Sequence, residues 1–250
     1  SRNRLRSYAL GYAIRNSESI RTVSEFQTAL IVERFDIKRN NVFICPPLLN
    51  SSYLNPKKIP RRRENKEVTL AFIGRLHSER GTAHLRELVA KLKSEDFNFK
   101  LLVLGSGPEE EELKREISKL LSPLQNEFYP FLQPRDMASF WAQTDLVLSL
   151  APSESYGRAM REALLFGVPV LTVESSGVKE LIQLVGNQSV LTVNPKDTSA
   201  EIRVKVEKLL TAGVSHKTKN QIMEVELRKN SLLIESWSQT MKEFKPKGSR

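Results

Sequence analysis

The chain has 250 residues, of which 40% are hydrophobic, and it carries a net charge of +10. This size and composition provide enough apolar side chains for a sizeable core, which argues against global disorder. No apolar segment is long enough to span a bilayer, and the basic start at residues 1–10 is not followed by the apolar segment of a secretory signal. The first residue is Ser1, so we expect a piece of a longer protein.

The excess positive charge lies on the flanks of the chain. Residues 1–67 hold 14 basic and 6 acidic residues, residues 68–215 hold 17 and 19, and residues 216–250 hold 8 and 4. A nucleic-acid-binding domain more often carries its charge on the folded face, so we expect no nucleic acid as a partner. Basic flanks are compatible with peripheral contact with an anionic membrane, although a solvated run of charges explains them equally well.

Cys45 is the only cysteine, which excludes an internal disulfide and a cysteine-based metal cage. This usage fits a reducing compartment, and we expect a cytoplasmic protein. The three histidines show no metal-ligand spacing, so we expect neither a metal nor a cofactor.

The first 56 residues contain a helix, a strand-like segment at 19–24, a second helix and a strand-like segment at 41–45. They resemble the tail of a preceding domain. A polar, basic stretch with prolines at its start predicts a linker at residues 57–67.

From residue 68 the pattern alternates between buried strands and amphipathic helices. Apolar runs predict strands at 68–74, 99–105, 127–132, 145–150, 168–173 and 189–193. Helical spacing predicts helices at 82–92, 108–121, 135–143, 177–185 and 198–211. The rhythm predicts a Rossmann-like open parallel sheet with helices on both faces over residues 68–215. Residues 216–250 are expected to be helical, with Leu232, Leu233 and Trp237 as apolar anchors.

Ligands of such sheets bind beyond the carboxyl ends of the strands, where polar side chains follow the predicted strands. Arg75 and Arg80 bracket a turn directly after the first strand, beside Gly74. Two guanidinium groups next to a glycine suit a diphosphate, because each guanidinium can donate two parallel hydrogen bonds. Two solvated loop arginines would give the same pattern. His77 lies in the same turn and is expected to be an exposed loop residue.

The segment from Glu154 to Glu162 carries the sharper pattern. Ser153 and Ser155 are cap-type residues, and a helix is expected to start near Gly157. The free N–H groups of that helix start would point at an anion. Glu154 would lie before the helix and Glu162 on its second turn, so the two carboxylates could reach opposite ends of an extended ligand. A helix-terminal carboxylate and a surface glutamate would produce the same sequence.

The surroundings of this segment resemble a known family. The stretches G-R-L with a following R-G, L-G-S-G-P, F-L-Q-P-R-D-M and T-D-L-V-L-S-L-A-P-S-E-S-Y-G-R-A-M-R-E-A-L-L-F-G-V-P-V-L look like the C-terminal, donor-binding domain of glycosyltransferase family 4, retaining enzymes of the GT-B fold. The resemblance covers residues 68–212. Residues 19–56 resemble the end of the N-terminal domain of that fold, and residues 231–244 resemble the terminal helix that crosses back to it.

The resemblance implies roles for the matching residues. Arg75 and Arg80 would bind the diphosphate, and Glu154 would contact the donor sugar near the anomeric centre. Glu162 would bind the ribose, and backbone near Leu132 would meet the base. Donor-binding positions are thus expected at Gly74, Ser155, Tyr156, Gly157, Arg158, Glu162 and Leu132.

Three positions depart from the family pattern. Arg80 stands where lysine is usual, Gln133 and Pro134 stand where a glycine is common, and Ser176 replaces one glycine of a G-G-x-x-E motif whose glutamate is Glu180. These departures leave the geometry at the base and at the phosphates open.

The expected function is therefore transfer of a sugar from a nucleoside-diphosphate sugar to an acceptor glycan, glycolipid or small molecule. The acceptor site of the family lies mostly in the N-terminal domain, so we expect weak donor binding and poor turnover from this chain alone. A non-catalytic nucleotide-sugar-binding or scaffold domain, and an epimerase or phosphorylase of the same fold, remain alternatives.

Overall fold

The computed structural model describes residues 2–50, 53 and 67–243, with side chains described for residues 7–50, 53 and 67–229. The chain divides into two units, one of residues 1–48 and 225–250 and one of residues 49–224. The predicted linker at 57–67 lies almost wholly outside the described residues, and the predicted anchors Leu232, Leu233 and Trp237 lie outside the described side chains.

The described part of the first unit is a small βαβ arrangement. Its elements before residue 49 are α1 (Arg2–Arg15), β1 (Ile20–Thr22), α2 (Glu25–Phe35), the 3-10 helix η1 (Arg39–Asn41) and β2 (Val42–Ile44). The strands β1 and β2 pair in parallel from Ile20 with Val42 to Thr22 with Ile44. Ser24 caps α2, since its side chain accepts a hydrogen bond from the Gln27 N–H.

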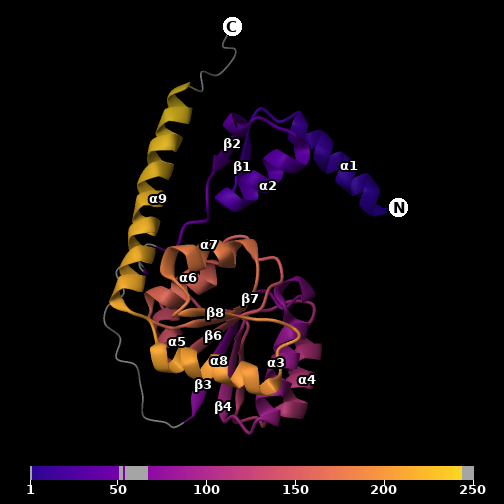
Figure 1. The fold of residues 1–250 in the computed structure, drawn as a ribbon, viewed down its shortest axis with the longest axis vertical. Helices are drawn as coiled ribbons and strands as arrows, with labels where there is room; N and C mark the ends of the chain where they lie inside the picture. Colours follow the sequence, from indigo (N-terminus) through magenta and orange to yellow (C-terminus); the bar gives the residue numbers. More distant parts are fainter. Residues whose placement is uncertain (1, 51–52, 54–66, 244–250) are drawn as a thin grey trace. The chain divides into compact units, whose positions relative to one another are not determined.

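The second unit is built on a six-stranded, fully parallel sheet (Figure 1). The strands are β3 (Val68–Ile73), β4 (Phe99–Leu104), β5 (Asn126–Tyr129), β6 (Leu146–Ser149), β7 (Val170–Val173) and β8 (Val190–Val193). The helices are η3 (Ser78–Arg80), α3 (Thr82–Ser94), α4 (Glu110–Leu120), α5 (Met137–Gln143), α6 (Arg158–Leu165), α7 (Ser176–Val185), α8 (Ser199–Ala212) and α9 (His216–Glu243), of which α9 continues into the first unit.

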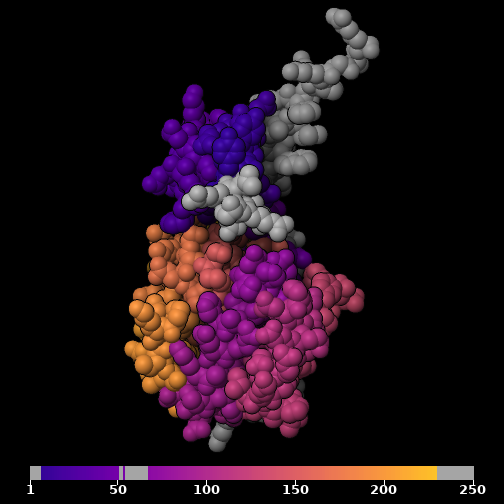
Figure 2. Space-filling view, turned by 90° about the vertical axis from the view of Figure 1, so that its right-hand side faces the viewer, coloured from indigo at the N-terminus to yellow at the C-terminus, as the bar shows by residue number. Residues whose placement is uncertain are grey.

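Helices cover both faces of this sheet, which confirms the predicted Rossmann-like fold. On one face Leu70 and Phe72 of β3 pack with side chains of α3, α4 and α8. On the other face Ala71 packs with side chains of α5, α6 and α7. Alternate residues of one strand thus enter two separate cores, as expected of a strand that is buried on both sides. The surfaces of α4, α3 and α8 lie side by side in Figure 2.

Proline shortens two of the predicted strands. The fifth strand was expected at 127–132, but β5 ends at Tyr129, directly before Pro130. The strand expected at 168–173 begins only at Val170, directly after Pro169. A proline has no N–H to donate to the sheet, so each strand stops or starts beside the proline.

The strand order β5-β4-β3-β6-β7-β8 locates the ligand-binding edge. The chain adds β4 and β5 on one side of β3 and then returns to add β6 on the other side. Ligands of doubly wound sheets bind at this reversal, beyond the carboxyl ends of the two central strands. Because β3 pairs with β6 from Leu70–Leu146 to Phe72–Leu148, the loops that follow these two strands lie next to each other.

Candidate functional site

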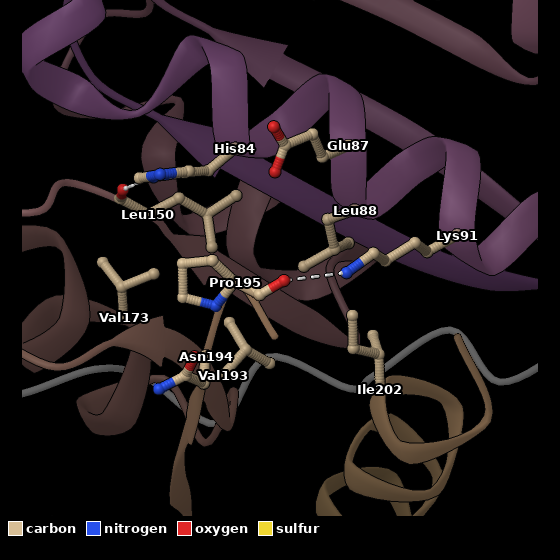
Figure 3. A pocket seen from close by; sticks show the side chains of 10 residues that line it. All are labelled: His84, Glu87, Leu88, Lys91, Leu150, Val173, Val193, Asn194, Pro195 and Ile202. Carbon is tan, nitrogen blue, oxygen red and sulfur yellow. Dashed lines mark hydrogen bonds between the residues drawn. The ribbon is translucent and has the colours of Figure 1, made fainter. Parts of the chain in front are cut away.

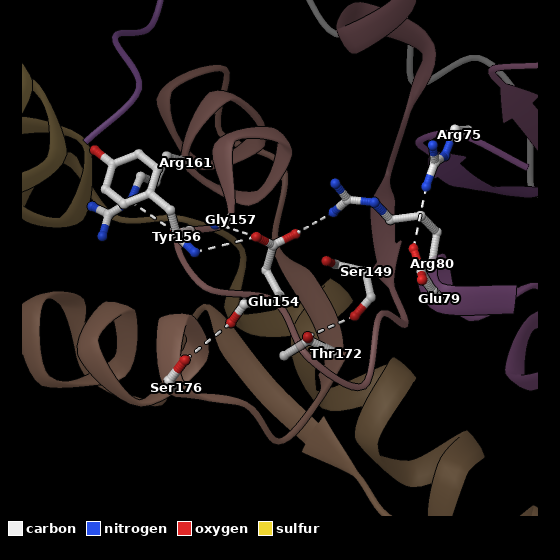
Figure 4. A network of polar contacts seen from close by, with 10 residues as sticks. All are labelled: Arg75, Glu79, Arg80, Ser149, Glu154, Tyr156, Gly157, Arg161, Thr172 and Ser176. Atoms are coloured by element: carbon white, nitrogen blue, oxygen red, sulfur yellow. Dashed lines mark hydrogen bonds and ion pairs between the residues drawn. The ribbon is translucent and has the colours of Figure 1, made fainter. Parts of the chain in front are cut away.

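The loops after β3 and β6 meet through an ion pair. Arg80 Nη1 lies 3.0 Å from Glu154 Oε2, although 74 residues separate the two in the sequence. The side chain of Arg80 is 47% exposed and that of Glu154 is 17% exposed. Of Arg75, Arg80 and Glu154, the three residues expected to act on the diphosphate and at the anomeric centre, the structure thus brings the last two together at the reversal point of the sheet (Figure 4).

Glu154 also closes the start of α6. Its Oε1 atom accepts hydrogen bonds from the Tyr156 N–H at 3.2 Å and from the Gly157 N–H at 3.0 Å. The N-cap residue is Gly157, whose φ of +77° is a left-handed conformation that favours glycine, and no side chain caps the helix from this position. Neither Ser153 nor Ser155 therefore caps this helix. The Glu154 carboxylate instead accepts hydrogen bonds from the N–H groups just before the helix.

The carboxylate of Glu154 consequently sits where positive charge converges. A guanidinium approaches one oxygen, and two N–H groups at the positive end of α6 approach the other. The group bound at this positively charged point is thus the chain's own Glu154 carboxylate.

Arg75 does not join this contact. Its Nη2 atom lies 3.2 Å from Glu79 Oε2, and both side chains are well exposed. The guanidinium of Arg75 lies in the same loop as Arg80 but pairs within that loop (Figure 4). His77 is half-buried and its Nδ1 accepts a hydrogen bond from the Glu79 N–H at 3.2 Å, so it stabilises the turn.

Glu162 lies in α6, as expected, but it is buried. Its side chain is 12% exposed and its Oε1 lies 3.5 Å from Arg158 Nη2. Burial raises the pKa of Glu162, and the nearby Arg158 guanidinium partly offsets that effect. The two glutamates of the segment therefore have different surroundings, one bonded to backbone N–H groups and the other buried beside Arg158.

Tyr156 contributes its backbone rather than its ring to this segment. The ring is 4% exposed and stacks against the guanidinium of Arg161, whose carbon lies 4.3 Å from the ring centroid. Arg161 is itself buried and its Nε donates to the Tyr156 carbonyl at 3.3 Å. Arg161 was not singled out from the sequence, where it stands between Met160 and Glu162 and gives no signal of its own.

The start of α7 packs against the Glu154 loop. The Gly177 N–H and the Ser176 hydroxyl both donate to the Glu154 carbonyl, at 2.9 and 3.4 Å. A Cβ atom at position 177 would lie 2.6 Å from the Tyr156 nitrogen, so this position needs glycine. Serine is accommodated at position 176, which explains how this chain keeps the loop with one glycine fewer than the motif it resembles.

The remaining expected positions lie at the same edge of the sheet. Gly74 follows β3 directly, and its N–H donates to the Leu104 carbonyl. Leu132 is half-buried in the loop after β5 and packs against the core on the α6 side. Ser155 is half-buried in the loop before α6, and Glu180 is half-buried on α7.

One residue that the sequence did not single out links the loops after β3 and β4. Glu109 precedes α4, and its Oε1 accepts a hydrogen bond from the Ser78 N–H at 2.8 Å. Its Oε2 accepts a hydrogen bond from the hydroxyl of Thr82. The hydrogen bond from Thr82 is the largest of the effects that hold the pKa of Glu109 below its usual value. In the sequence, the one feature that could have indicated a role for Glu109 is its position just after a predicted strand and a loop with two glycines.

A separate hollow lies between α3 and the ends of β7 and β8 (Figure 3). Its lining is mostly apolar, with Leu88, Leu150 and Val173 among its residues. Lys91 donates to the carbonyls of Pro195 and Asp197, and His84 Nδ1 lies 3.2 Å from the Leu150 carbonyl. These side chains stabilise the loops around the hollow and do not converge on a common point.

The described residues form neither a metal-binding cluster nor a membrane-spanning helix. Among them, no group of three or more His, Cys, Asp or Glu side chains could hold a metal ion. None of the helices that the structure describes combines the length and the apolar character needed to cross a bilayer.

Comparison with known proteins identifies the family. The family model "Glycosyl transferases group 1" matches residues 55–230. A glycosyltransferase of Haemophilus influenzae is 28% identical over 172 residues, which are 68% of this chain and 46% of the relative. A 2-deoxystreptamine glucosyltransferase of Streptomyces kanamyceticus is 22% identical over 207 residues, which are 80% of this chain and 53% of the relative. The chain thus spans about half the length of the curated relatives it matches.

Solved structures share the fold. A variant of TarM from S. aureus, in complex with UDP among other ligands, superposes with a TM-score of 0.71 at 20% identity, over 89% of this chain and 45% of TarM. HepE from Anabaena, in complex with UDP-glucose, superposes with a TM-score of 0.73 at 17% identity, over 93% of this chain and 67% of HepE. The family match covers well over half of the chain. The chain therefore belongs to the glycosyl transferases group 1 family.

Proposed function

We propose that this chain holds the donor site of a retaining glycosyltransferase of family 4, which transfers a sugar from a nucleoside-diphosphate sugar to an acceptor hydroxyl. The observation that carries the proposal is the convergence of Arg80 and the two N–H groups before α6 on one point at the reversal of the sheet. This arrangement binds a carboxylate in the present structure and has the charge needed for a diphosphate.

The relatives support a nucleotide sugar as the donor. TarM is described with UDP and HepE with UDP-glucose, and the relative from S. kanamyceticus is a glucosyltransferase. The family similarity and the charge of the site both support a nucleoside-diphosphate sugar as the ligand.

In the proposed mechanism, the hard step is departure of the diphosphate from a sugar that develops positive charge. Arg75, Arg80 and the backbone N–H groups from Ser155 to Arg158 would stabilise the negative charge that develops on the leaving group. No metal ion is needed for that purpose, because these groups supply the positive charge.

Glu154 would orient the sugar near the anomeric carbon rather than act as a base. In the structure its carboxylate accepts hydrogen bonds from the Arg80 side chain and from two N–H groups. A diphosphate that binds to these groups must therefore displace the carboxylate. Release from these contacts would free the carboxylate to accept hydrogen bonds from sugar hydroxyls.

Glu162 and Leu132 complete the proposed donor contacts. The buried Glu162 would accept hydrogen bonds from the ribose hydroxyls, and the loop around Leu132 would meet the base. For the whole protein, the proposal also includes binding of an acceptor. It further includes a cytoplasmic location, with peripheral contact between the basic flanks and an anionic membrane.

Calorimetric titration with UDP-, GDP- and ADP-sugars tests the donor site. We expect at least one of them to bind, and Arg80→Ala to weaken that ligand about tenfold, the loss expected for one charge-assisted contact. Arg203→Ala is the matched control, since Arg203 is a similarly exposed arginine that pairs with Glu207 on α8. No binding of any of the three at millimolar concentration would contradict the donor site.

Transfer by the full-length protein separates catalysis from mere binding. Glu154→Ala should lower the transfer rate by about a hundredfold or more, as the loss of a positioned polar group at a reacting centre does. The anomeric configuration of the product, measured by NMR, should match that of the donor. Unchanged transfer by Glu154→Ala would favour a non-catalytic role for the site, and an inverted product would contradict retention.

A further inference from the structure

The turn that carries Arg80 is held at both ends by one side chain. Arg80 is the last residue of η3, and Glu109 accepts a hydrogen bond from Ser78 at the start of η3 and another from Thr82 just beyond its end. The first N–H groups of a helical turn have no partner within the turn, so the carboxylate satisfies a group that would otherwise need water.

The backbone of Glu109 is attached to the same loop. Its N–H donates to the Leu76 carbonyl at 3.1 Å, and the Leu76 N–H donates to the Ser106 carbonyl at 2.9 Å. The carboxylate therefore extends from a segment that is itself fixed against the loop after β3. A side chain anchored in this way can set the direction of the turn, and not only fill space beside it.

From Glu109 a continuous set of contacts reaches the start of α6. The carboxylate holds residues 78–82, Arg80 within that segment contacts Glu154, and Glu154 accepts the N–H groups of Tyr156 and Gly157. Loops that follow three different strands, β3, β4 and β6, are thereby connected. Each step is a hydrogen bond or an ion pair.

We infer that Glu109 is a positioning residue for the donor site, which directs Arg80 toward Glu154 and toward the diphosphate that replaces Glu154. This inference rests on the proposed function for its ligand, but the arrangement of the three loops exists without a ligand. Thr82, which makes the second contact, is 1% exposed, so this end of the segment is fixed in the core while Arg80 remains half-exposed. Without the carboxylate, the segment would lose both hydrogen bonds, and only the burial of Thr82 would still fix one of its ends.

A purely structural role would give a different result from a positioning role. If Glu109 acts through Arg80, its removal has an effect on diphosphate binding only while Arg80 is present. If Glu109 merely stabilises the fold, its removal has the same effect with and without Arg80. A double-mutant cycle separates the two cases.

The cycle compares the unmodified chain, Glu109→Ala, Arg80→Ala and the double variant for affinity to UDP, GDP and ADP. We expect Glu109→Ala to weaken the bound nucleotide about tenfold in the unmodified background and less than about twofold when Arg80 is already absent. Glu109→Gln should weaken nucleotide binding less than Glu109→Ala does. The side-chain carbonyl of the glutamine can still accept a hydrogen bond from the Ser78 N–H, while its amide group faces Thr82. Glu112→Ala is the control, since Glu112 lies on the same helix and pairs with Arg86.

Hydrogen exchange in the absence of nucleotide gives a second readout, which does not depend on the proposed function. In Glu109→Ala and Glu109→Gln, amides at 78–82 and those of Tyr156 and Gly157 should exchange faster than in the unmodified chain, and Glu112→Ala should leave them unchanged. Equal losses in both backgrounds of the cycle would overturn the inference, as would unchanged exchange at Tyr156 and Gly157. If no nucleotide binds the unmodified chain, the proposed function fails and the exchange result alone decides the inference.

Discussion

Two glutamates eight positions apart along the chain, Glu154 and Glu162, have opposite surroundings. Glu154 accepts hydrogen bonds from an arginine and from two backbone N–H groups. Glu162 is buried, and Arg158, its charged partner among the described residues, is half-exposed. A buried carboxylate such as that of Glu162 lowers the stability of the folded chain unless a ligand supplies hydrogen-bond donors. Such a loss of stability is common at binding sites.

The raised pKa of Glu162 predicts how stability changes with pH. Its folded-state pKa lies above the ordinary value of 4.5, so between these two values the folded protein holds more protons than the unfolded one. The free energy of unfolding contributed by this group therefore falls as the pH rises from 4.5 through the folded-state pKa, and it stays low above that point.

Glu162→Gln should remove this dependence. Denaturant titrations between pH 4 and pH 8 should show the variant gaining stability relative to the unmodified chain as the pH rises, without a further change at higher pH. Glu162→Ala, which also loses packing, should follow the same pH dependence with a constant offset. A difference between the unmodified chain and both variants that does not vary with pH would contradict the buried, desolvated state of Glu162.

At the scale of elements, the site depends on close approach between α7 and the loop before α6. The Gly177 N–H donates to the Glu154 carbonyl, and the space at its Cα is filled by backbone from Glu154 to Tyr156. The helix start and the loop are thus positioned by one another. A change in either should be felt at the N–H groups that face Glu154.

Gly177→Ala should destabilise the protein, although alanine is the better helix former by about 1 kcal/mol. Its Cβ would meet backbone atoms at 2.6 to 2.9 Å, which cannot move as a flexible side chain does, so we expect a loss of about 1–3 kcal/mol in denaturant titrations. Ser176→Ala, which loses only the 3.4 Å contact to the Glu154 carbonyl, should change stability by less than about 0.5 kcal/mol. A Gly177→Ala variant that is more stable than the unmodified chain would contradict the packing described here.

The sequence predicted the elements of the second unit well because most of its strands are largely apolar and its helices have an apolar face. It also placed Arg80 and Glu154 after strands. The sequence could not predict that these residues touch, because the contact depends on β6 pairing with β3, and a repeating strand–helix pattern does not specify the order of strands. The role of Glu109 escaped for the same reason, since its partners lie 27 and 31 residues away.

The cap of α6 escaped for a different reason. Ser153 and Ser155 have the side chains that usually cap helices, whereas the structure places a left-handed glycine at the cap and a carboxylate three residues before it. Local preferences were overridden by the turn that directs Glu154 toward Arg80. Strand ends beside Pro130 and Pro169 were misplaced by two or three residues, although the physical reason was visible in the sequence.

At the scale of the whole molecule, the two units differ in the strand pairing and apolar packing that stabilise them. The second unit has six paired strands and two large cores, whereas the described sheet of the first unit has two strands of three residues each. Large apolar side chains of the first unit are exposed, among them Tyr8 at 72%, Tyr12 at 63% and Phe43 at 57%. A two-stranded sheet is marginal without further packing.

Native-state hydrogen exchange should therefore distinguish the units. Amides of β3, β4 and β6 should be the slowest, with opening free energies near that of global unfolding, and those of β1 and β2 should exchange much faster. Thr22 and Thr28, whose hydroxyls are 2.6 Å apart in the buried part of the first unit, mark the segments where its slowest amides are expected. Equal protection in both sheets would show that the first unit has more stabilising contacts than its described residues provide.

We propose that the segment from Glu154 to Glu162 holds the diphosphate of a nucleotide sugar. The most direct measurement is an NMR titration of the isotope-labelled chain with UDP, GDP and ADP, which follows the backbone amides residue by residue. We predict that at least one nucleotide shifts the amides of Ser155, Tyr156, Gly157 and Arg158 most strongly, as its phosphates replace the Glu154 carboxylate. Shifts confined to other parts of the chain, such as the hollow beside His84 and Asn194, or no shift with any nucleotide, would contradict the claim.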